Sequence, residues 1–120
     1  LITARYAMRN HHVATALRCG DITYFGLHLD NHGFDVCGEP SAISAACVAG
    51  VNRFDEIVSV HWSGSRHEGP TIIPPCGNCR QLLLDVAPDI HILIPDESDN
   101  LGYRRVTPAD LLPHAYQKPS

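Results

Sequence analysis

The sequence predicts a single α/β domain, spanning residues 1–120, in which helices cover a mixed sheet. Two β-rich segments flank a turn near the N-terminus, and apolar residues then recur at helical spacing in two separate stretches. Compact β-branched runs stand between and after these stretches. Strands that alternate with helices favour an α/β fold. The 120 residues, of which 44% are apolar, suit one domain with one core.

The N-terminal part is expected to form a β-hairpin. Residues 12–17 and 22–29 together carry β-branched and aromatic side chains, and they flank the Gly20-Asp21 pair, which is typical of a tight turn. A short amphipathic segment over residues 1–8 precedes the hairpin.

Two helices are predicted in the middle of the chain. Residues 40–51 are rich in alanine and have apolar side chains at four-residue spacing, and Gly50 and Asn52 supply stop signals. A second apolar face follows Cys76 and ends before Pro88, which interrupts a helix. The two faces consist of Ile43, Cys47 and Val51 in the first helix and of Cys79, Leu82, Leu83 and Val86 in the second.

Further strands and a last short helix complete the predicted fold. The run of residues 56–62 predicts a strand, the polar stretch 63–71 a mobile loop, and residues 91–94 a short buried strand. Thr107 and Pro108 provide a helix cap and a proline at the first helical position, which predicts a helix through Leu112.

Charge and composition narrow the classes of function. The net charge is −4 and Arg104-Arg105 is the only adjacent basic pair, so we expect no nucleic-acid partner and a free small-molecule substrate. Apolar runs are too short to span a bilayer and the N-terminus lacks a secretory signal, so no membrane partner and a cytoplasmic location are expected. Five cysteines, two of them in a C-x-x-C, fit metal binding better than disulfides.

Three cysteines and one glutamate carry most of the functional information. They lie in Cys37-Gly38-Glu39 and in Pro75-Cys76-Gly77-Asn78-Cys79-Arg80, each at the start of a predicted helix. Zn²⁺ favours four tetrahedral ligands, and a catalytic site keeps one position for water, so three thiolates would form an open site. Helix N-termini favour the thiolate form of a cysteine.

Glu39 and Arg80 fit supporting roles beside such a site. Glu39, two residues after a ligand, can take a proton from a water whose pKa the zinc lowers to about 7. Arg80 can offset the net negative charge of three thiolates around Zn²⁺. The alternative is a structural zinc site closed by a fourth protein ligand. A first cluster with one cysteine and a carboxylate argues against that alternative.

The C-x-E and P-C-x-x-C pairing resembles the signature of zinc-dependent nucleobase deaminases. The chain as a whole resembles the cytidine deaminase family, and its blasticidin-S deaminase-like members look most similar. The segments that carry this resemblance are GLHLD at residues 26–30, Cys37-Gly38-Glu39, PCGNCRQLLLDVAPDI at residues 75–90 and DLLPHAY at residues 110–116.

The resemblance implies a fold, a metal and an assembly. The implied fold is a three-layer α/β/α arrangement around a five-stranded mixed sheet. Cys37, Cys76 and Cys79 would bind zinc, Glu39 would be the catalytic acid and base, and Arg80 would moderate the thiolate charge. The resemblance also implies a homotetramer, or a dimer, with substrate pockets completed by neighbouring subunits.

Departures from the family pattern fall where the substrate would bind. His28 and Asp30 stand in place of an Asn and a Glu that hydrogen-bond the ribose in a G-x-N-x-E segment, and both can still bond a hydroxyl. Gly38 replaces an alanine and is expected to open space beside the metal. Pro75 and Phe34 are further candidate substrate contacts, although an aromatic residue is more often part of the core. Tyr116 is another pocket candidate through the resemblance.

The predicted function is zinc-dependent hydrolytic deamination of a cytosine-type nucleoside or analogue, with release of ammonia. Cytidine, deoxycytidine and compounds like blasticidin S are the expected substrates. One alternative is a deaminase of a purine, pterin or triazine free base. A second alternative is a non-catalytic zinc-binding relative.

Overall fold

The computed structural model describes residues 12–31, 34–62, 69–117 and 119, and the side chains of residues 30, 31 and 34 are outside this description. The amphipathic segment predicted for residues 1–8 and most of the mobile loop predicted for residues 63–71 lie outside the described residues. The strands are β1 Val13–Cys19, β2 Ile22–Leu27, β3 Leu29–Asn31, β4 Phe34–Val36, β5 Glu56–His61, β6 Thr71–Ile73, β7 His91–Pro95 and β8 Tyr103–Val106. The helices are α2 Gly38–Val48, α3 Gly77–Val86 and α4 Pro108–Leu111.

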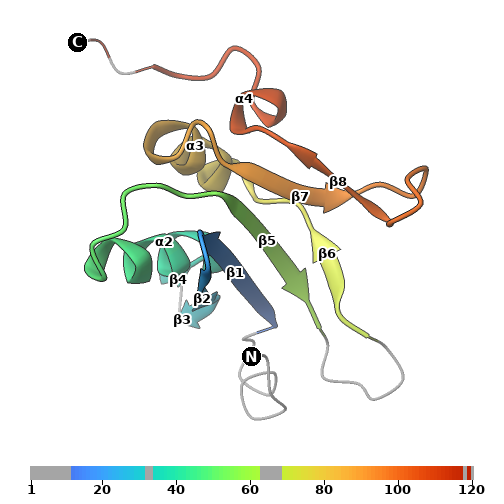
Figure 1. Ribbon diagram of the computed structural model, residues 1–120, viewed down its shortest axis with the longest axis horizontal. Coiled ribbons are helices and arrows are strands. Elements are labelled where there is room, and N and C mark those ends of the chain that lie inside the picture. Colours follow the sequence, from blue (N-terminus) through green and yellow to red (C-terminus); the bar gives the residue numbers. More distant parts are fainter. Residues whose placement is uncertain (1–11, 32–33, 63–68, 118, 120) are drawn as a thin grey trace.

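A mixed sheet forms the centre of the molecule, as predicted (Figure 1). Five strands follow the order β2-β1-β5-β7-β8, and only the β5–β7 pair on this path is parallel. A parallel pair needs a long crossover, which here contains α3. The short strand β6 pairs with the second half of β5, beyond the part that pairs with β7. The sheet therefore has the expected five-strand path and one short additional strand.

The N-terminal hairpin is confirmed. Strands β1 and β2 pair from Ala14 opposite Leu27 to Cys19 opposite Ile22, with Gly20 and Asp21 in the turn. Gly20 has a φ of +61°, a left-handed conformation that glycine adopts without steric cost. The first strand extends two residues further than its predicted end.

Helices α2 and α3 pack against the same face of the sheet and enclose the core with it. Gly26 of β2 permits the close approach of α2, because a Cβ at this position would overlap the carbonyl oxygen of Gly38. These two helices provide one of the two helical layers that the resemblance implies. The core consists of Leu17, Ala42, Ile43, Ala46, Ile57, Leu83, Ala87, Ile90, Ile92, Ile94 and Val106.

Helix boundaries differ from the predicted ones by a few residues. Helix α2 begins at Gly38, two residues before Pro40. The helix tolerates Pro40 in its first turn, because an N–H group there would have no partner within the helix. It ends at Val48, ahead of Gly50, which has a φ of +88°. The buried side chains of this helix include Ala42, Ile43 and Ala46. Cys47, which the sequence places on the apolar face, is exposed, so that placement is wrong.

The C-terminal helix starts as its sequence predicts. Thr107 and Asp110 form a reciprocal capping box around the first turn of α4, with Pro108 at the first helical position. The helix ends at Leu111, one residue before its predicted end. None of the helices in the described ranges is long and apolar enough to cross a membrane.

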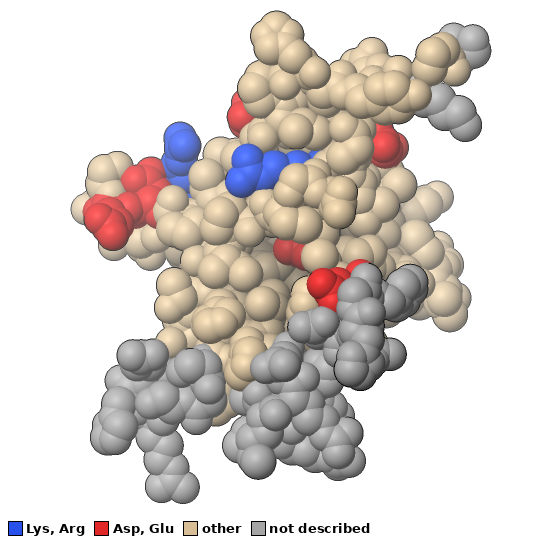
Figure 2. Space-filling model, turned by 180° about the vertical axis from the view of Figure 1, so that it is seen from behind, with Lys and Arg blue, Asp and Glu red and all other residues tan. Residues whose placement is uncertain are grey.

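Charged side chains are spread over the surface seen from behind in Figure 2. On this face, basic side chains lie in small groups separated by uncharged surface, and acidic side chains occur on the same face. Arg105 pairs with Glu56 at 2.6 Å and Arg104 with Asp96 at 3.6 Å, so part of the basic charge is matched locally.

Candidate metal centre and active site

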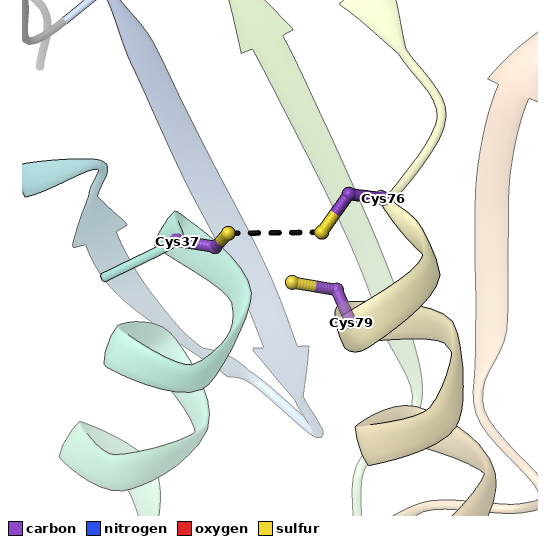
Figure 3. A group of neighbouring side chains, drawn as sticks. All are labelled: Cys37, Cys76 and Cys79. Carbon is purple, nitrogen blue, oxygen red and sulfur yellow. Dashed lines mark hydrogen bonds between the residues drawn. The ribbon is translucent and has the colours of Figure 1, made fainter. Parts of the chain in front are cut away.

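The cysteines of both motifs meet between the first turns of α2 and α3 (Figure 3). Cys37 directly precedes α2 and Cys76 directly precedes α3, each with an extended backbone conformation, and Cys79 lies in the first turn of α3. The three sulfur atoms point into the same gap between the helices. This placement at two helix N-termini agrees with the sequence prediction.

The sulfur positions fit a single tetrahedral metal ion. The ligand atoms of Cys37, Cys76 and Cys79 all lie within 4.8 Å of one another, and the Sγ atoms of Cys37 and Cys76 are 3.7 Å apart. Zinc–sulfur bonds of about 2.3 Å at tetrahedral angles require sulfur atoms roughly 3.8 Å apart. Among the described residues, this is the one group of metal-ligand type in such proximity.

The chemistry of the donor set also favours a cation. Burial, Coulomb repulsion from Glu39 and hydrogen bonds with the neighbouring side chains raise the pKa of the Cys79 thiol far above its ordinary value. Burial likewise raises the pKa of Cys37. Burial opposes ionisation of Cys76 as well, but hydrogen bonds from the backbone N–H groups and thiols around it lower its pKa overall. The thiols of Cys37 and Cys79 therefore resist ionisation on their own, and a bound cation would offset the repulsion among three thiolates.

Glu39 lies beside this cluster in the first turn of α2. Its carboxylate is buried, with 6% of the residue exposed, and accepts a 2.6 Å hydrogen bond from Ser59 Oγ at Oε1. The same carboxylate interacts with the Cys79 thiol through charge and hydrogen bonding. An acceptor of protons is thus held at the edge of the three-sulfur group.

Arg80 follows Cys79 and binds two backbone oxygens, one just before α3 and one at the end of α4. Its Nε donates to the carbonyl of Pro75 at 2.9 Å, and its Nη1 donates to the carbonyl of Leu111 at 3.1 Å. The guanidinium therefore fixes the backbone one residue before Cys76 and joins it to α4. Moderation of the thiolate charge stays a prediction for this residue.

The structure describes the side chains of some of the residues that are predicted to contact the substrate. The backbone N–H of His28 donates to the Val13 carbonyl at 2.9 Å, which holds this half-buried residue between β2 and β3. Asp30 and Phe34 belong to a separate hairpin of β3 and β4, in which Asp30 opposes Asp35, and their side chains lie outside the described atoms. Pro75 is buried and lines a small space with Glu39. The roles of all these residues stay predictions.

Gly38 and Tyr116, two further candidates for the substrate pocket, have neighbours that the structure defines. A Cβ at Gly38 would overlap the side-chain oxygen of Thr15, so the room beside this glycine is filled by that threonine. Tyr116 is largely exposed, and its carbonyl accepts a 3.0 Å hydrogen bond from Gln81 Nε2 of α3. The C-terminal segment is thereby held against the helix that carries Cys79 and begins directly after Cys76.

Sequence reasoning missed Thr15 and Ser59. Both are almost completely buried, and their hydroxyl oxygens are 2.7 Å apart. The available signal was a polar residue on the inward face of a β-branched run, since Ser59 follows Ile57 at the two-residue period of β5. No spacing rule linked that serine to a glutamate twenty residues earlier.

The fold and the cysteine cluster together define an α/β protein with three cysteines arranged as in the zinc sites of deaminases. No family model matches the chain. The chain is 36% identical to blasticidin-S deaminase from Bacillus cereus over 99 aligned residues. This alignment covers 78% of this chain and 70% of that protein. It is 29% identical to cytidine deaminase from Mycoplasma genitalium over 91% of this chain and 81% of the relative.

Solved structures give the same result. The cytidine deaminase of Burkholderia pseudomallei superimposes with a TM-score of 0.68 at 28% identity, over 95% of this chain and 87% of that one. The cytidine deaminase of Mycobacterium leprae superimposes with a TM-score of 0.66 at 30% identity, over 93% and 85% of the two chains. The chain therefore belongs to the cytidine deaminase family.

Proposed function

We propose that this protein is a zinc-dependent aminohydrolase that replaces the 4-amino group of a cytosine-type nucleoside or analogue by a carbonyl oxygen and releases ammonia. The observation that carries the proposal is the position of Glu39, whose buried carboxylate lies beside three convergent cysteine side chains. Kinship with blasticidin-S and cytidine deaminases supports this reaction.

Cys37, Cys76 and Cys79 would hold the zinc ion. Bound zinc with three protein ligands keeps a position for water and lowers the pKa of that water to about 7. Backbone hydrogen bonds from Asn78 and Cys79 in the first turn of α3 lower the pKa of Cys76, as expected for a cysteine at a helix N-terminus, and so favour its thiolate form.

Glu39 would carry the protons of the reaction. Its carboxylate accepts a proton from the attacking water, transfers it to the ring nitrogen of the substrate, and assists the transfer to the departing amino nitrogen. Burial at the start of α2 keeps the carboxylate close to the reacting atoms and away from bulk water. Ser59 holds one of its oxygens.

The substrate is proposed to be a nucleoside-type compound with a modified sugar or a substituent on it. His28 and Asp30 occupy the segment that would meet the sugar, and they differ in reach from the amide and the longer carboxylate of the family pattern. An imidazole and a short carboxylate can bond hydroxyl or amino groups at other distances. One relative is named as a blasticidin-S deaminase, so blasticidin S is included among the candidate substrates.

Ammonia release from a substrate panel tests the proposal. The panel contains cytidine, deoxycytidine, blasticidin S and aminated free bases of the purine, pterin and triazine types, each incubated with zinc-loaded protein. Turnover of at least one cytosine-type nucleoside or analogue is expected. Activity confined to the free bases would replace the proposal by the second candidate, a free-base deaminase. The altered segment around His28 and Asp30 motivates this candidate as well, because a free base has no ribose to bind.

A non-catalytic zinc protein is the contrasting possibility. It requires zinc to be closed by a fourth protein ligand or Glu39 to be turned away from the metal. A metal-loaded crystal structure with either feature, together with no turnover of any compound on the panel, would overturn the enzymatic proposal. A sizing measurement on the same preparation tests the homotetramer that we propose from the family resemblance.

A further inference from the structure

Three buried polar side chains form a hydrogen-bonded series that ends at Glu39. Thr15 on β1, Ser59 on β5 and Glu39 on α2 are 1%, 4% and 6% exposed, respectively. Thr15 Oγ1 lies 2.7 Å from Ser59 Oγ, and Ser59 Oγ donates to Glu39 Oε1 at 2.6 Å. Buried polar groups cost free energy unless they are hydrogen-bonded, so this series is a coherent unit within the core.

The number of hydroxyl protons fixes the direction of these bonds. Ser59 has one hydroxyl proton and gives it to the Glu39 carboxylate, so its remaining interaction with Thr15 must be as an acceptor. Thr15 is therefore the donor of the first bond. Both hydroxyl dipoles point toward the carboxylate, and each bond polarises the next one.

Sheet register and the neighbouring helix place these residues together. Thr15 and Ser59 are direct partners across the antiparallel β1–β5 pair, on the face that α2 covers. The Thr15 side chain reaches into the position that a side chain at residue 38 would occupy, because a Cβ on Gly38 would overlap its oxygen. Glycine between Cys37 and Glu39 is thus the residue that lets this threonine fit.

We propose that Thr15 and Ser59 are positioning residues for Glu39, with Gly38 as the residue that makes room for them. This inference rests on the proposed function, in which Glu39 carries protons. The Ser59 hydroxyl binds Oε1 and thereby fixes the orientation of the Glu39 carboxylate. Thr15 acts through Ser59, because it orients the serine hydroxyl toward the carboxylate.

Shape-conserving variants separate positioning from packing. Ser59→Ala and Thr15→Val remove a hydroxyl and keep nearly the same shape, whereas the matched variant Thr15→Ser keeps the hydroxyl and removes a methyl group. Ile94→Val, a core change on β7, serves as the control for a general loss of stability.

The measurements are kcat, KM and zinc content per chain, with a compound that the wild-type protein deaminates. Ser59→Ala is expected to lower kcat by about 10- to 100-fold, the usual effect of removing a partner that orients a group at a metal site. KM and zinc content should change by less than about threefold, in line with loss of a transition-state interaction alone. The loss of kcat should be smaller in Thr15→Val than in Ser59→Ala. The kcat of Thr15→Ser should equal that of the Ile94→Val control.

The inference would be overturned by wild-type kcat in both Ser59→Ala and Thr15→Val. It would also be overturned if Thr15→Ser lost as much kcat as Thr15→Val, because packing would then explain both losses. A zinc-loaded crystal structure of Ser59→Ala gives a readout without activity. The Glu39 carboxylate should leave its wild-type orientation or occupy two orientations, and an unmoved carboxylate contradicts positioning.

That structural readout also separates two kinds of failure. If wild-type protein deaminates nothing on the panel, the proposed function fails, while the orientation of Glu39 in the variant still decides whether Ser59 positions it. If wild-type protein is active and the variants keep full kcat, the positioning inference alone fails.

Discussion

Arg80 Nη1 donates a 3.1 Å hydrogen bond to the carbonyl oxygen of Leu111 and thereby connects the helix of the C-x-x-C motif to the C-terminal helix α4. The Nε of the same guanidinium donates to the Pro75 carbonyl, one residue before Cys76. One side chain thus holds two backbone segments around the start of α3. The planar fork of arginine suits this task, since it presents several donors in a fixed geometry.

Replacement of this arginine should weaken metal binding. Arg80→Lys keeps the positive charge and loses the fork, so the backbone before Cys76 should become less well fixed. We expect apparent zinc affinity, measured by competition with a chelator, to fall by about 10-fold or more, as for other residues that orient metal ligands. Arg53→Lys, an exposed substitution, is the matched control. Unchanged affinity in Arg80→Lys, combined with a loss in Arg80→Ala, would show that charge alone matters.

Zinc should stabilise the folded protein through Cys79. A ligand that binds only the folded state stabilises it by RT ln(1 + [L]/Kd), about 2.7 kcal/mol at a ligand concentration of 100 Kd. Thermal unfolding of chelator-treated protein should shift upward on addition of zinc. Cys79→Ala should lose most of this shift, because a buried ligand of the cluster is removed. Cys47→Ala, at an exposed cysteine outside the cluster, should retain it.

Glu39→Gln should separate metal binding from proton transfer. The amide keeps the size of the side chain and can accept the bond from Ser59, but it cannot take up a proton at neutral pH. Zinc content should stay at one ion per chain while kcat falls by about 100-fold or more, the range that general acid–base catalysis supplies. Near-normal turnover by this variant across the substrate panel would mean that another group carries the proton.

Much of the fold followed from sequence pattern, as the N-terminal hairpin and α3 illustrate. A Gly20-Asp21 turn between β-rich segments and an apolar face ended by Pro88 are local signals, and the structure agrees with both. The C-x-E and P-C-x-x-C motifs likewise predicted that Cys37 would meet the other two cysteines.

The missed parts depend on contacts that are distant in sequence. The β3–β4 hairpin, β6 and β8 were not predicted as strands, because each is four residues or shorter and lacks a strong apolar period. The bond from Ser59 to Glu39 arises only when β5 and α2 pack together. Cys47 was misassigned because the four-residue spacing of Ile43, Cys47 and Val51 suggests one apolar face. The face of α2 that is buried instead contains Ala42, Ile43 and Ala46.

Acid should weaken the cap of α4. Hydrogen bonds from the backbone and the side chain of Thr107 hold the pKa of Asp110 below its ordinary value. A lowered folded-state pKa contributes stability above the unfolded pKa of about 3.9, and that contribution is lost as the pH falls through the folded-state value. The melting temperature of the wild-type protein should therefore exceed that of Asp110→Asn at pH 6. This difference should shrink when the pH is lowered below about 4. A constant difference from pH 6 into the acid range would exclude ionisation as its cause.

Gly38 and Thr15 should behave as a coupled pair. A Cβ on residue 38 would overlap the Thr15 oxygen, so Gly38→Ala should destabilise the protein by about 1–3 kcal/mol, the usual cost of overpacking. Thr15→Ala removes the obstructing oxygen and also removes the donor to Ser59. In the double variant the added methyl group fits, so its destabilisation should be smaller than the sum of the two single losses by about 1 kcal/mol, a size expected for residues in contact. Denaturant unfolding of the four proteins measures this coupling. Strict additivity would mean that the backbone moves to accommodate the added methyl group and that glycine is not required by the threonine.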